Sequence, residues 1–187
     1  MSLVGHDEPW REWRAALAGG KMHHGWILTG KRGLGKASFA LEAAAELVGQ
    51  PGVHAPPPDA HPDVLLLVPA PDSEEEERKR ADGKPYKAKR GIGIDVVRRM
   101  QKRLETRPTL GPRRAVIVDA ADDLERSAFN ALLKSLEEPP QGTYFLLVAH
   151  RLGRLPATIR SRCRTLRFGA LDEAALAAAL DAAAPDI

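Results

Sequence analysis

A short apolar run leads into a glycine-rich turn in the stretch Trp26-Ile27-Leu28-Thr29-Gly30-Lys31-Arg32-Gly33-Leu34-Gly35-Lys36. Residues 30–36 fit the pattern G-x-x-x-x-G-K of a phosphate-binding loop, in which glycines let backbone N–H groups turn toward phosphate oxygens. The context agrees, because a strand is predicted at 26–28 and a helix rich in Ala, Leu and Glu at 37–48. The alternative is a glycine-rich turn with a solvated lysine, and this agreement favours the loop. We therefore expect nucleotide phosphates to bind Gly30, Gly33, Gly35 and Lys36.

The end of this pattern departs from that of a nucleotide hydrolase. A Ser or Thr should follow the lysine, since its hydroxyl holds Mg²⁺, but Ala37 stands there. Ser38 comes one place late, and one position on a helix is a rotation of about 100°. Ser38 stays a candidate nucleotide contact, but it cannot simply replace the missing metal ligand.

A second acidic element ends a buried strand. Residues 115–118 are apolar and Asp119 closes the run, so its carboxylate is expected beside the phosphate loop, on the Mg²⁺ side. Two alanines follow, Ala120 and Ala121, and the next acids are Asp122 and Asp123. Either acid could cap the following helix or take part in catalysis, and we favour capping.

Strand and helix patterns alternate along the chain. This alternation predicts a three-layer α/β domain over residues 1–168, with a five-stranded, mostly parallel sheet. Residues 69–91 are strongly charged and are predicted to be a solvated loop or excursion. An Ala/Leu helix is expected from Asp172, so residues 169–187 are interpreted as the start of a helical lid domain in an N-terminal piece of a longer protein. Strands are expected at 26–28, 64–68, 115–118, 144–148 and 165–168, and helices at 10–17, 37–48, 94–104, 127–137 and 158–161.

Composition excludes several classes of protein. The chain has 187 residues and a net charge of +3, with 28 basic and 25 acidic side chains, which permits an anionic partner without requiring one. The single cysteine, Cys163, excludes an intramolecular disulfide. No apolar stretch approaches the roughly 20 residues of a membrane-spanning helix, and the N-terminus lacks the pattern of a signal peptide. A cytoplasmic location is expected.

Four stretches together resemble the clamp-loader branch of the AAA+ ATPases, and above all its delta-prime type of DNA polymerase III subunit. The resemblance spans roughly residues 20–170 and includes the phosphate loop and residues 116–123. Its most specific parts are Asn130-Ala131-Leu132-Leu133-Lys134, Glu137-Glu138-Pro139-Pro140 and Ser161-Arg162-Cys163.

The resemblance implies a function. Subunits of this branch form an open ring that loads a sliding clamp on primed DNA during replication, so the implied partners are AAA+ ATPase and delta-type subunits, the clamp and DNA. It implies that Arg162 reaches ATP held by a neighbouring subunit, as an arginine finger. Delta-prime subunits typically do not hydrolyse ATP, which agrees with Ala37 and with Ala120 at the position of the water-activating glutamate. ATP or ADP is expected to bind weakly, at the phosphate loop, Ser38 and Asp119.

Two other functions stay open at this point. The first is an active ATP-hydrolysing subunit that uses Lys36, Ser38, Asp119 and Asp122. The second is a DNA-binding module that uses basic side chains at 78–90 and 98–103. Many members of the family carry a zinc-binding cysteine cluster after the first helix of the domain. Here residues 49–63 hold no cysteine, and His54, His61 and Asp59 are too few for a structural site, so no zinc is predicted.

Overall fold

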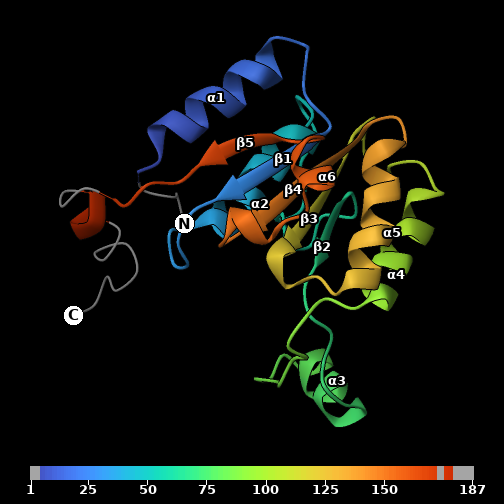
Figure 1. Ribbon diagram of the computed structural model, residues 1–187. Helices are drawn as coiled ribbons and strands as arrows, with labels where there is room; N and C mark the ends of the chain where they lie inside the picture. Colours follow the sequence, from blue (N-terminus) through green and yellow to red (C-terminus); the bar gives the residue numbers. More distant parts are fainter. Residues whose placement is uncertain (1–4, 172–174, 179–187) are drawn as a thin grey trace.

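One parallel sheet organises the protein (Figure 1). The computed structural model describes residues 5–171 and 175–178. Five strands pair in the order β2-β3-β4-β1-β5, and every pairing is parallel. The inner strands are buried along nearly their whole length, as their continuous apolar sequences require. The strands are Gly25–Thr29 (β1), Val64–Leu67 (β2), Arg114–Asp119 (β3), Thr143–Ala149 (β4) and Arg164–Arg167 (β5).

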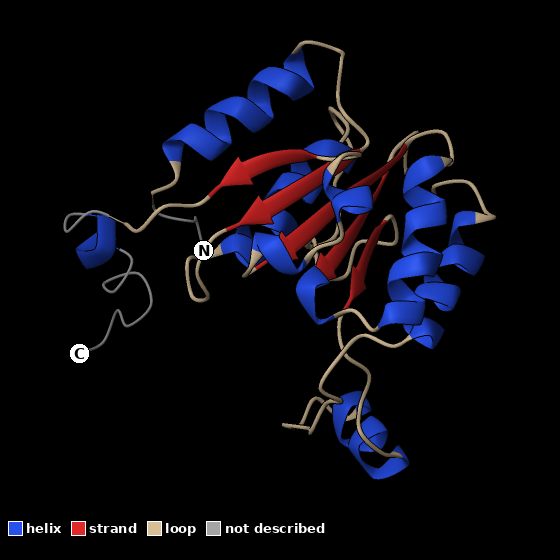
Figure 2. Ribbon diagram, viewed as in Figure 1, coloured by secondary structure: helices blue, strands red, loops and turns tan. Residues whose placement is uncertain are grey.

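Helices cover both faces of this sheet (Figure 2). The first face is packed against α1 (Asp7–Ala18) and α2 (Lys36–Val48). The other face is packed against α4 (Ile94–Leu104), α5 (Arg126–Glu137) and the short α6 (Ala157–Arg160). The 3₁₀ turns η1 (Ala121–Asp123) and η2 (Leu152–Arg154) follow β3 and β4. The predicted three-layer fold is confirmed.

Aromatic side chains join the first helix to the sheet. Trp13 is fully buried, and its ring centroid lies 5.4 Å from that of Trp26 in an edge-to-face arrangement. Trp10 packs on Phe39 of α2 with 4.1 Å between ring centroids. Such pairs stabilise a core beyond their buried area. The helix predicted at 10–17 is therefore present as α1, with both of its tryptophans buried against the sheet side.

The charged segment 69–91, called the excursion below, is partly helical rather than an irregular loop. It contains α3 (Glu74–Ala81), which projects from the body of the domain (Figure 1). Ser73 caps this helix, since its hydroxyl accepts a hydrogen bond from Glu76 N. Acidic residues occupy the first turn and basic residues the last, which suits the helix dipole. No α3 residue is buried, so local capping and charge, which the hydrophobic pattern does not report, explain the difference.

A buried pair of charges fixes the amino-terminal edge of the sheet. Asp63 and Arg114 are almost completely buried, with 3.9 Å between Oδ1 and Nη2. The Asp63 carboxylate accepts hydrogen bonds from Thr109 N and Leu110 N at 2.6 and 2.7 Å. The Arg114 guanidinium donates to three carbonyls within residues 103–107, at 2.6–2.9 Å. This network holds the connection between α4 and β3, and the sequence analysis did not predict it.

Only a small part of the predicted lid lies among the described residues. Residues 175–178 are helical, and the rest of the helix expected from Asp172 lies outside the described residues. The boundary at residue 168 stays a prediction. No helix in the described part of the chain is both long and apolar enough to cross a bilayer.

Candidate functional site

The phosphate loop, residues 30–36, joins β1 to α2 at the carboxyl edge of the sheet. Gly35 precedes α2 with φ 75°, a conformation that favours glycine. Gly30 lies so close to the end of β5 that a Cβ atom there would collide with the Phe168 carbonyl. Gly33 lies at the exposed turn of the loop. The N-terminus of α2 therefore opens directly onto the loop, which is the arrangement that favours an anion.

Lys36 is turned into the loop. Its side chain is only 3% exposed, and Nζ donates hydrogen bonds to the carbonyls of Gly30 and Lys31 at 2.7 and 2.6 Å. Burial lowers the pKa of Lys36, and the negative charges of Asp119 and Asp122 oppose this shift. The ammonium group is thus held by two backbone carbonyls of the loop.

The structure brings Asp119 to the same edge. It closes β3, half-buried. Burial raises the pKa of its carboxyl group, and the nearby His150, Lys36 and Arg32 lower it by a smaller amount. Lys36 and Asp119, predicted to lie together, are therefore electrostatic neighbours.

Asp122 does not cap a helix, and that prediction is wrong. Its carboxylate accepts hydrogen bonds from His150 N and Arg151 N, at 3.0 and 3.1 Å, just after β4. No side chain caps α5, which begins after Glu125. Asp122 is buried because it joins the turn after β3 to the end of the neighbouring strand. Both of its oxygens are therefore engaged by the backbone.

His150 is a site residue that the sequence analysis missed. His150 directly follows β4, and β4 lies between β3 and β1 in the sheet. His150 is therefore near Asp119, which ends β3, and near the phosphate loop, which follows β1. Its Nδ1 is buried without a hydrogen-bond partner among the described residues. Ligands of parallel sheets bind at the carboxyl ends of the strands. The position of His150 directly after a predicted strand is therefore the signal that could have marked it as a site residue.

The structure offers few groups for a metal ion. Ala37 is half-buried and Ser38 is exposed, while Ala120 and Ala121 are buried. Within residues 5–171 and 175–178, no group of three or more His, Cys, Asp or Glu side chains could hold a metal. The site therefore fits phosphate groups and supplies one uncommitted carboxylate, Asp119, for a cation.

Arg162 lies far from this edge. It stands between α6 and β5, with its side chain 36% exposed. Nη2 forms an ion pair with Glu137 Oε1 at 2.8 Å, and Nη1 donates to the Thr158 carbonyl at 2.8 Å. These contacts fix the guanidinium on the surface where α5 and α6 meet.

Arg162 and the phosphate loop lie at opposite ends of β1. A Cβ atom on Gly25, the first residue of β1, would lie 3.2 Å from the Arg162 carbonyl. The loop follows Thr29, at the other end. A strand of this length spans about 16 Å at about 3.3 Å per residue. The guanidinium therefore cannot reach a nucleotide bound to its own chain.

Comparison with known families and relatives agrees with this architecture. A family model described as "DNA polymerase III, delta subunit" matches residues 5–172. Subunit delta' of DNA polymerase III from Pseudomonas aeruginosa is 32% identical over 168 residues, which cover 83% of this chain and 46% of that protein. Subunit tau from Escherichia coli is 31% identical over 91% of this chain and 25% of its own length. The chain thus spans a quarter to a half of these relatives.

Solved structures share the fold. A DNA polymerase III gamma subunit-related protein from Thermotoga maritima has a TM-score of 0.61 and 26% identity, over 86% of this chain and 47% of that chain. The Holliday junction branch migration motor RuvB of the same organism has a TM-score of 0.60 over 97% of this chain and 51% of its own, and at 17% identity it supports the fold alone. The predicted AAA+ fold is confirmed. With the family model matching nearly the whole domain, the chain belongs to the DNA polymerase III delta-subunit family.

Proposed function

We propose that the chain is the AAA+ domain of a clamp-loader subunit of the delta-prime type, which does not hydrolyse ATP and supplies Arg162 to a neighbouring subunit. The partners would be AAA+ ATPase subunits and a delta-type subunit, with the sliding clamp and primed DNA reached through the complex. The family membership and the DNA polymerase III relatives support a role in this machine. A cytoplasmic location stays a prediction.

The state of the nucleotide site carries the non-hydrolysing part of the proposal. The loop and Lys36 keep the form of a phosphate site, but Ala37 offers no hydroxyl to Mg²⁺. Asp122, the acid that could act as a base, already accepts two backbone hydrogen bonds. A positioned acid–base group contributes about 10²–10⁴-fold to a rate. ATP or ADP would therefore bind weakly, without turnover.

The location of Arg162 supports a role in trans. It lies at the edge of the sheet opposite its own phosphate loop, on a half-exposed surface. A guanidinium is permanently charged and can bind two phosphate oxygens at once. The ion pair with Glu137 is half-exposed as well, and such pairs contribute little free energy. A phosphate presented by a neighbour could therefore displace the carboxylate.

Reconstitution of the full-length protein with clamp-loader partners tests this function. An arginine supplied in trans is worth about 10³–10⁵-fold in rate at the site it serves. Arg162→Ala should therefore silence one ATP site, lower the clamp- and DNA-stimulated ATPase by a fraction, and reduce clamp loading further. Assembly of the ring, measured by gel filtration, should stay unchanged.

Arg160→Ala is the matched control, because Arg160 is an exposed arginine on the adjacent α6. Equal, wild-type-like clamp loading by both variants would contradict the role of Arg162. Steady ATP turnover by the purified protein alone, abolished by Lys36→Ala, would instead establish an active ATPase.

A further inference from the structure

The outer strand β2 forms the floor of an open groove. Only β3 pairs with β2 among the described residues, so the other edge of the strand is open. The groove has a volume of about 310 Å³ and lies between this edge, the outer side of α4 and the start of the excursion. Its floor is apolar, and Leu66 is 45% exposed. We call it the edge groove.

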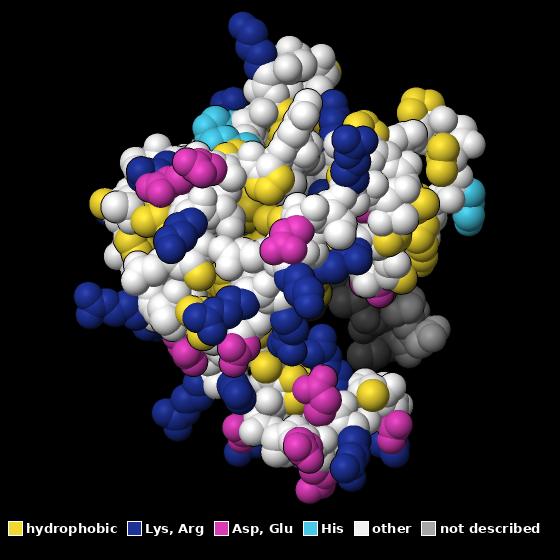
Figure 3. Space-filling view, turned by 90° about the vertical axis from the view of Figure 1, so that its right-hand side faces the viewer, with side chains coloured by type: hydrophobic (Ala, Val, Ile, Leu, Met, Phe, Trp, Pro, Cys, Tyr) yellow, Lys and Arg dark blue, Asp and Glu magenta, His cyan; other side chains and the backbone are white. Residues whose placement is uncertain are grey.

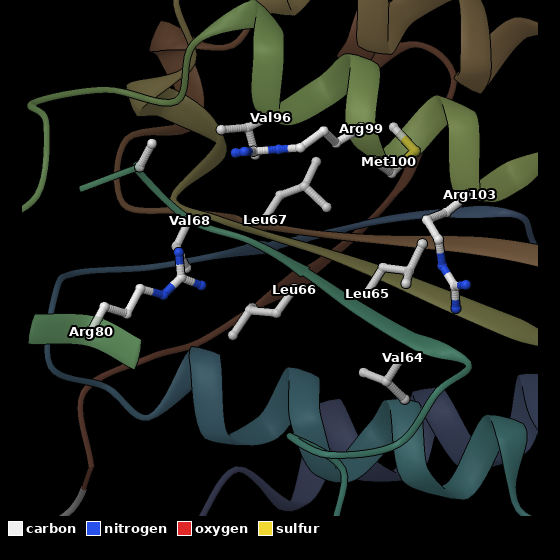
Figure 4. A pocket seen from close by; sticks show the side chains of 11 residues that line it. Val64, Leu65, Leu66, Leu67, Val68, Arg80, Val96, Arg99, Met100 and Arg103 are labelled. Atoms are coloured by element: carbon white, nitrogen blue, oxygen red, sulfur yellow. The ribbon is translucent and has the colours of Figure 1, made fainter. Parts of the chain in front are cut away.

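Three arginines border the edge groove (Figure 4). Arg99 and Arg103 project from α4, and Arg80 comes from α3. None of them forms an ion pair within the described part of the chain, and no acidic side chain lines the groove. Figure 3 shows basic side chains beside apolar ones where the excursion meets the body, with acidic side chains among them. Arg103 Nη2 donates to the Pro62 carbonyl at 3.2 Å, and the Arg80 guanidinium lies 5.8 Å from the centroid of the Tyr86 ring, so neither contact neutralises the charge. The groove therefore joins an apolar floor to a positively charged border.

The strand edge supplies a third feature. The Asp63 carbonyl accepts a hydrogen bond from Ala115 N of β3. Backbone groups alternate between the two edges of a strand, so the N–H and C=O of Leu66 point to the open edge. Such an edge readily pairs with another extended chain.

We propose that the edge groove binds an extended acidic peptide of a partner protein, which adds a strand beside β2. Strand addition uses main-chain hydrogen bonds for affinity and alternate side chains for specificity. Leu65 and Leu67 pack toward α4 and its arginines, whereas Val64 packs on the opposite face. The occupant therefore has acidic side chains on the α4 face, and apolar side chains on the face shared with Leu66, in alternation.

The groove fits a peptide better than a nucleic acid. Phosphate binding needs cations but neither an apolar floor nor a free strand edge. Single-stranded nucleic acid uses aromatic platforms for its bases, and the groove is lined by none. The leucine floor and the open edge of β2 are the features that decide between the two partners.

The test is fluorescence anisotropy on the full chain. The probe is a labelled peptide in which Glu and Val alternate, and its counterpart carries Lys in place of Glu. We expect saturable binding of the Glu peptide alone. Arg99→Glu should weaken it about tenfold, because it reverses a charge beside the bound carboxylates. Arg98→Glu is the matched control: Arg98 is exposed on the same helix, does not line the groove, and its replacement changes the net charge equally.

Backbone methylation of the probe tests strand addition without altering the protein. In an added strand, every second N–H of the peptide points to β2. Methylation of this set of N–H groups should abolish binding, and methylation of the set that points away from β2 should not. Absence of binding, equal binding of the Lys peptide, or an equal response to Arg98→Glu and Arg99→Glu would each overturn the proposal. Labelled single-stranded and duplex DNA form the last arm. If Arg99→Glu weakened only DNA binding, the groove would be a nucleic-acid contact and the proposal would be wrong.

Discussion

Two groups of buried charge lie at opposite edges of the same sheet and differ in how their polar atoms are used. At the amino-terminal edge, Asp63 and Arg114 are bonded to five backbone groups of one connection, and Arg114 Nε is the atom of this pair left without a partner among the described residues. At the carboxyl edge, Lys36 is bonded to two loop carbonyls. There, no described group is bonded to Nδ1 of His150, a neighbour of Asp119.

The difference separates a charge held inside a structural network from one that we propose contacts a phosphate. The Asp63 carboxylate and the two Nη atoms of Arg114 are engaged by a buried connection, and removing either member of the pair leaves an unpaired ion in the interior. The Lys36 ammonium group has three N–H donors and bonds two loop carbonyls, so one donor is left for a ligand. Burial alone is therefore a poor guide to function. Mutations at the amino-terminal edge should therefore lower stability, whereas mutations at the carboxyl edge should weaken ligand binding and leave stability nearly unchanged.

The largest effect is expected at the amino-terminal edge. Asp63→Ala leaves the buried Arg114 guanidinium without its carboxylate and the N–H groups of Thr109 and Leu110 without their acceptor, so we expect a loss of about 3–5 kcal/mol in the free energy of unfolding. Chemical denaturation measures it. Asp59→Ala, at an exposed position in the segment that precedes β2, should change stability by less than about 0.5 kcal/mol. Similar values for the two variants would remove the structural role of the pair.

Lys36→Met should separate binding from stability. The variant loses two hydrogen bonds to carbonyls but also the desolvation of a buried ammonium group, so the free energy of unfolding should change by less than about 1 kcal/mol. Binding of ADP, measured by calorimetry, should weaken at least about tenfold. Lys31→Met, on the exposed part of the loop, is the control. A destabilisation as large as that of Asp63→Ala would mean that both edges are structural.

A smaller effect, on the free energy of unfolding and its dependence on pH, is expected for Asp119→Asn. The pKa of Asp119 is raised in the folded protein, so its ionised form lowers stability at neutral pH. This penalty disappears as the pH falls through the folded pKa toward the ordinary value of about 4. Asp119→Asn should therefore be more stable than the wild type at neutral pH, by less than about 1 kcal/mol.

Thermal melting between neutral and mildly acidic pH measures the difference, which should shrink as the pH falls. Asp123→Asn is the control at a nearby position. An advantage of Asp119→Asn that grew on acidification would mean that the carboxylate is stabilised by its cationic neighbours.

The smallest effect is expected at the exposed pair between Arg162 and Glu137. Glu137→Gln removes an ion pair whose two side chains are 36% and 42% exposed, and exposed pairs contribute about 0–1 kcal/mol. Thermal melting should therefore show almost no change, and Glu138→Gln serves as the neighbouring control. A large destabilisation would show that Arg162 is a structural residue, which would weaken its proposed role in trans.

Much of the fold follows from local pattern. The strands at β1, β3 and β4 are continuous apolar runs, and the tryptophans of α1 recur at helical spacing, so these elements and the three-layer architecture were predicted. The helix in the excursion was not predicted, because α3 has no apolar face. It is stabilised by the Ser73 cap, and by acidic residues in its first turn and basic residues in its last turn. The sequence offers the basic side chains at 98–103 together, as candidates for contact with DNA. The structure instead divides them, with Arg99 and Arg103 at the edge groove and Arg98 outside it.

The site shows the same division. Spacing predicted the glycine-rich turn between β1 and α2, which the structure shows, and the absence of a hydroxyl after Lys36, because both depend on neighbours along the chain. It could not identify the role of Asp122, the presence of His150, or the pair of Asp63 and Arg114. Those depend on which strand ends meet, and that is decided by the strand order β2-β3-β4-β1-β5. Local sequence determines backbone geometry over a few residues, whereas the partners of a buried polar atom are set by contacts between distant segments.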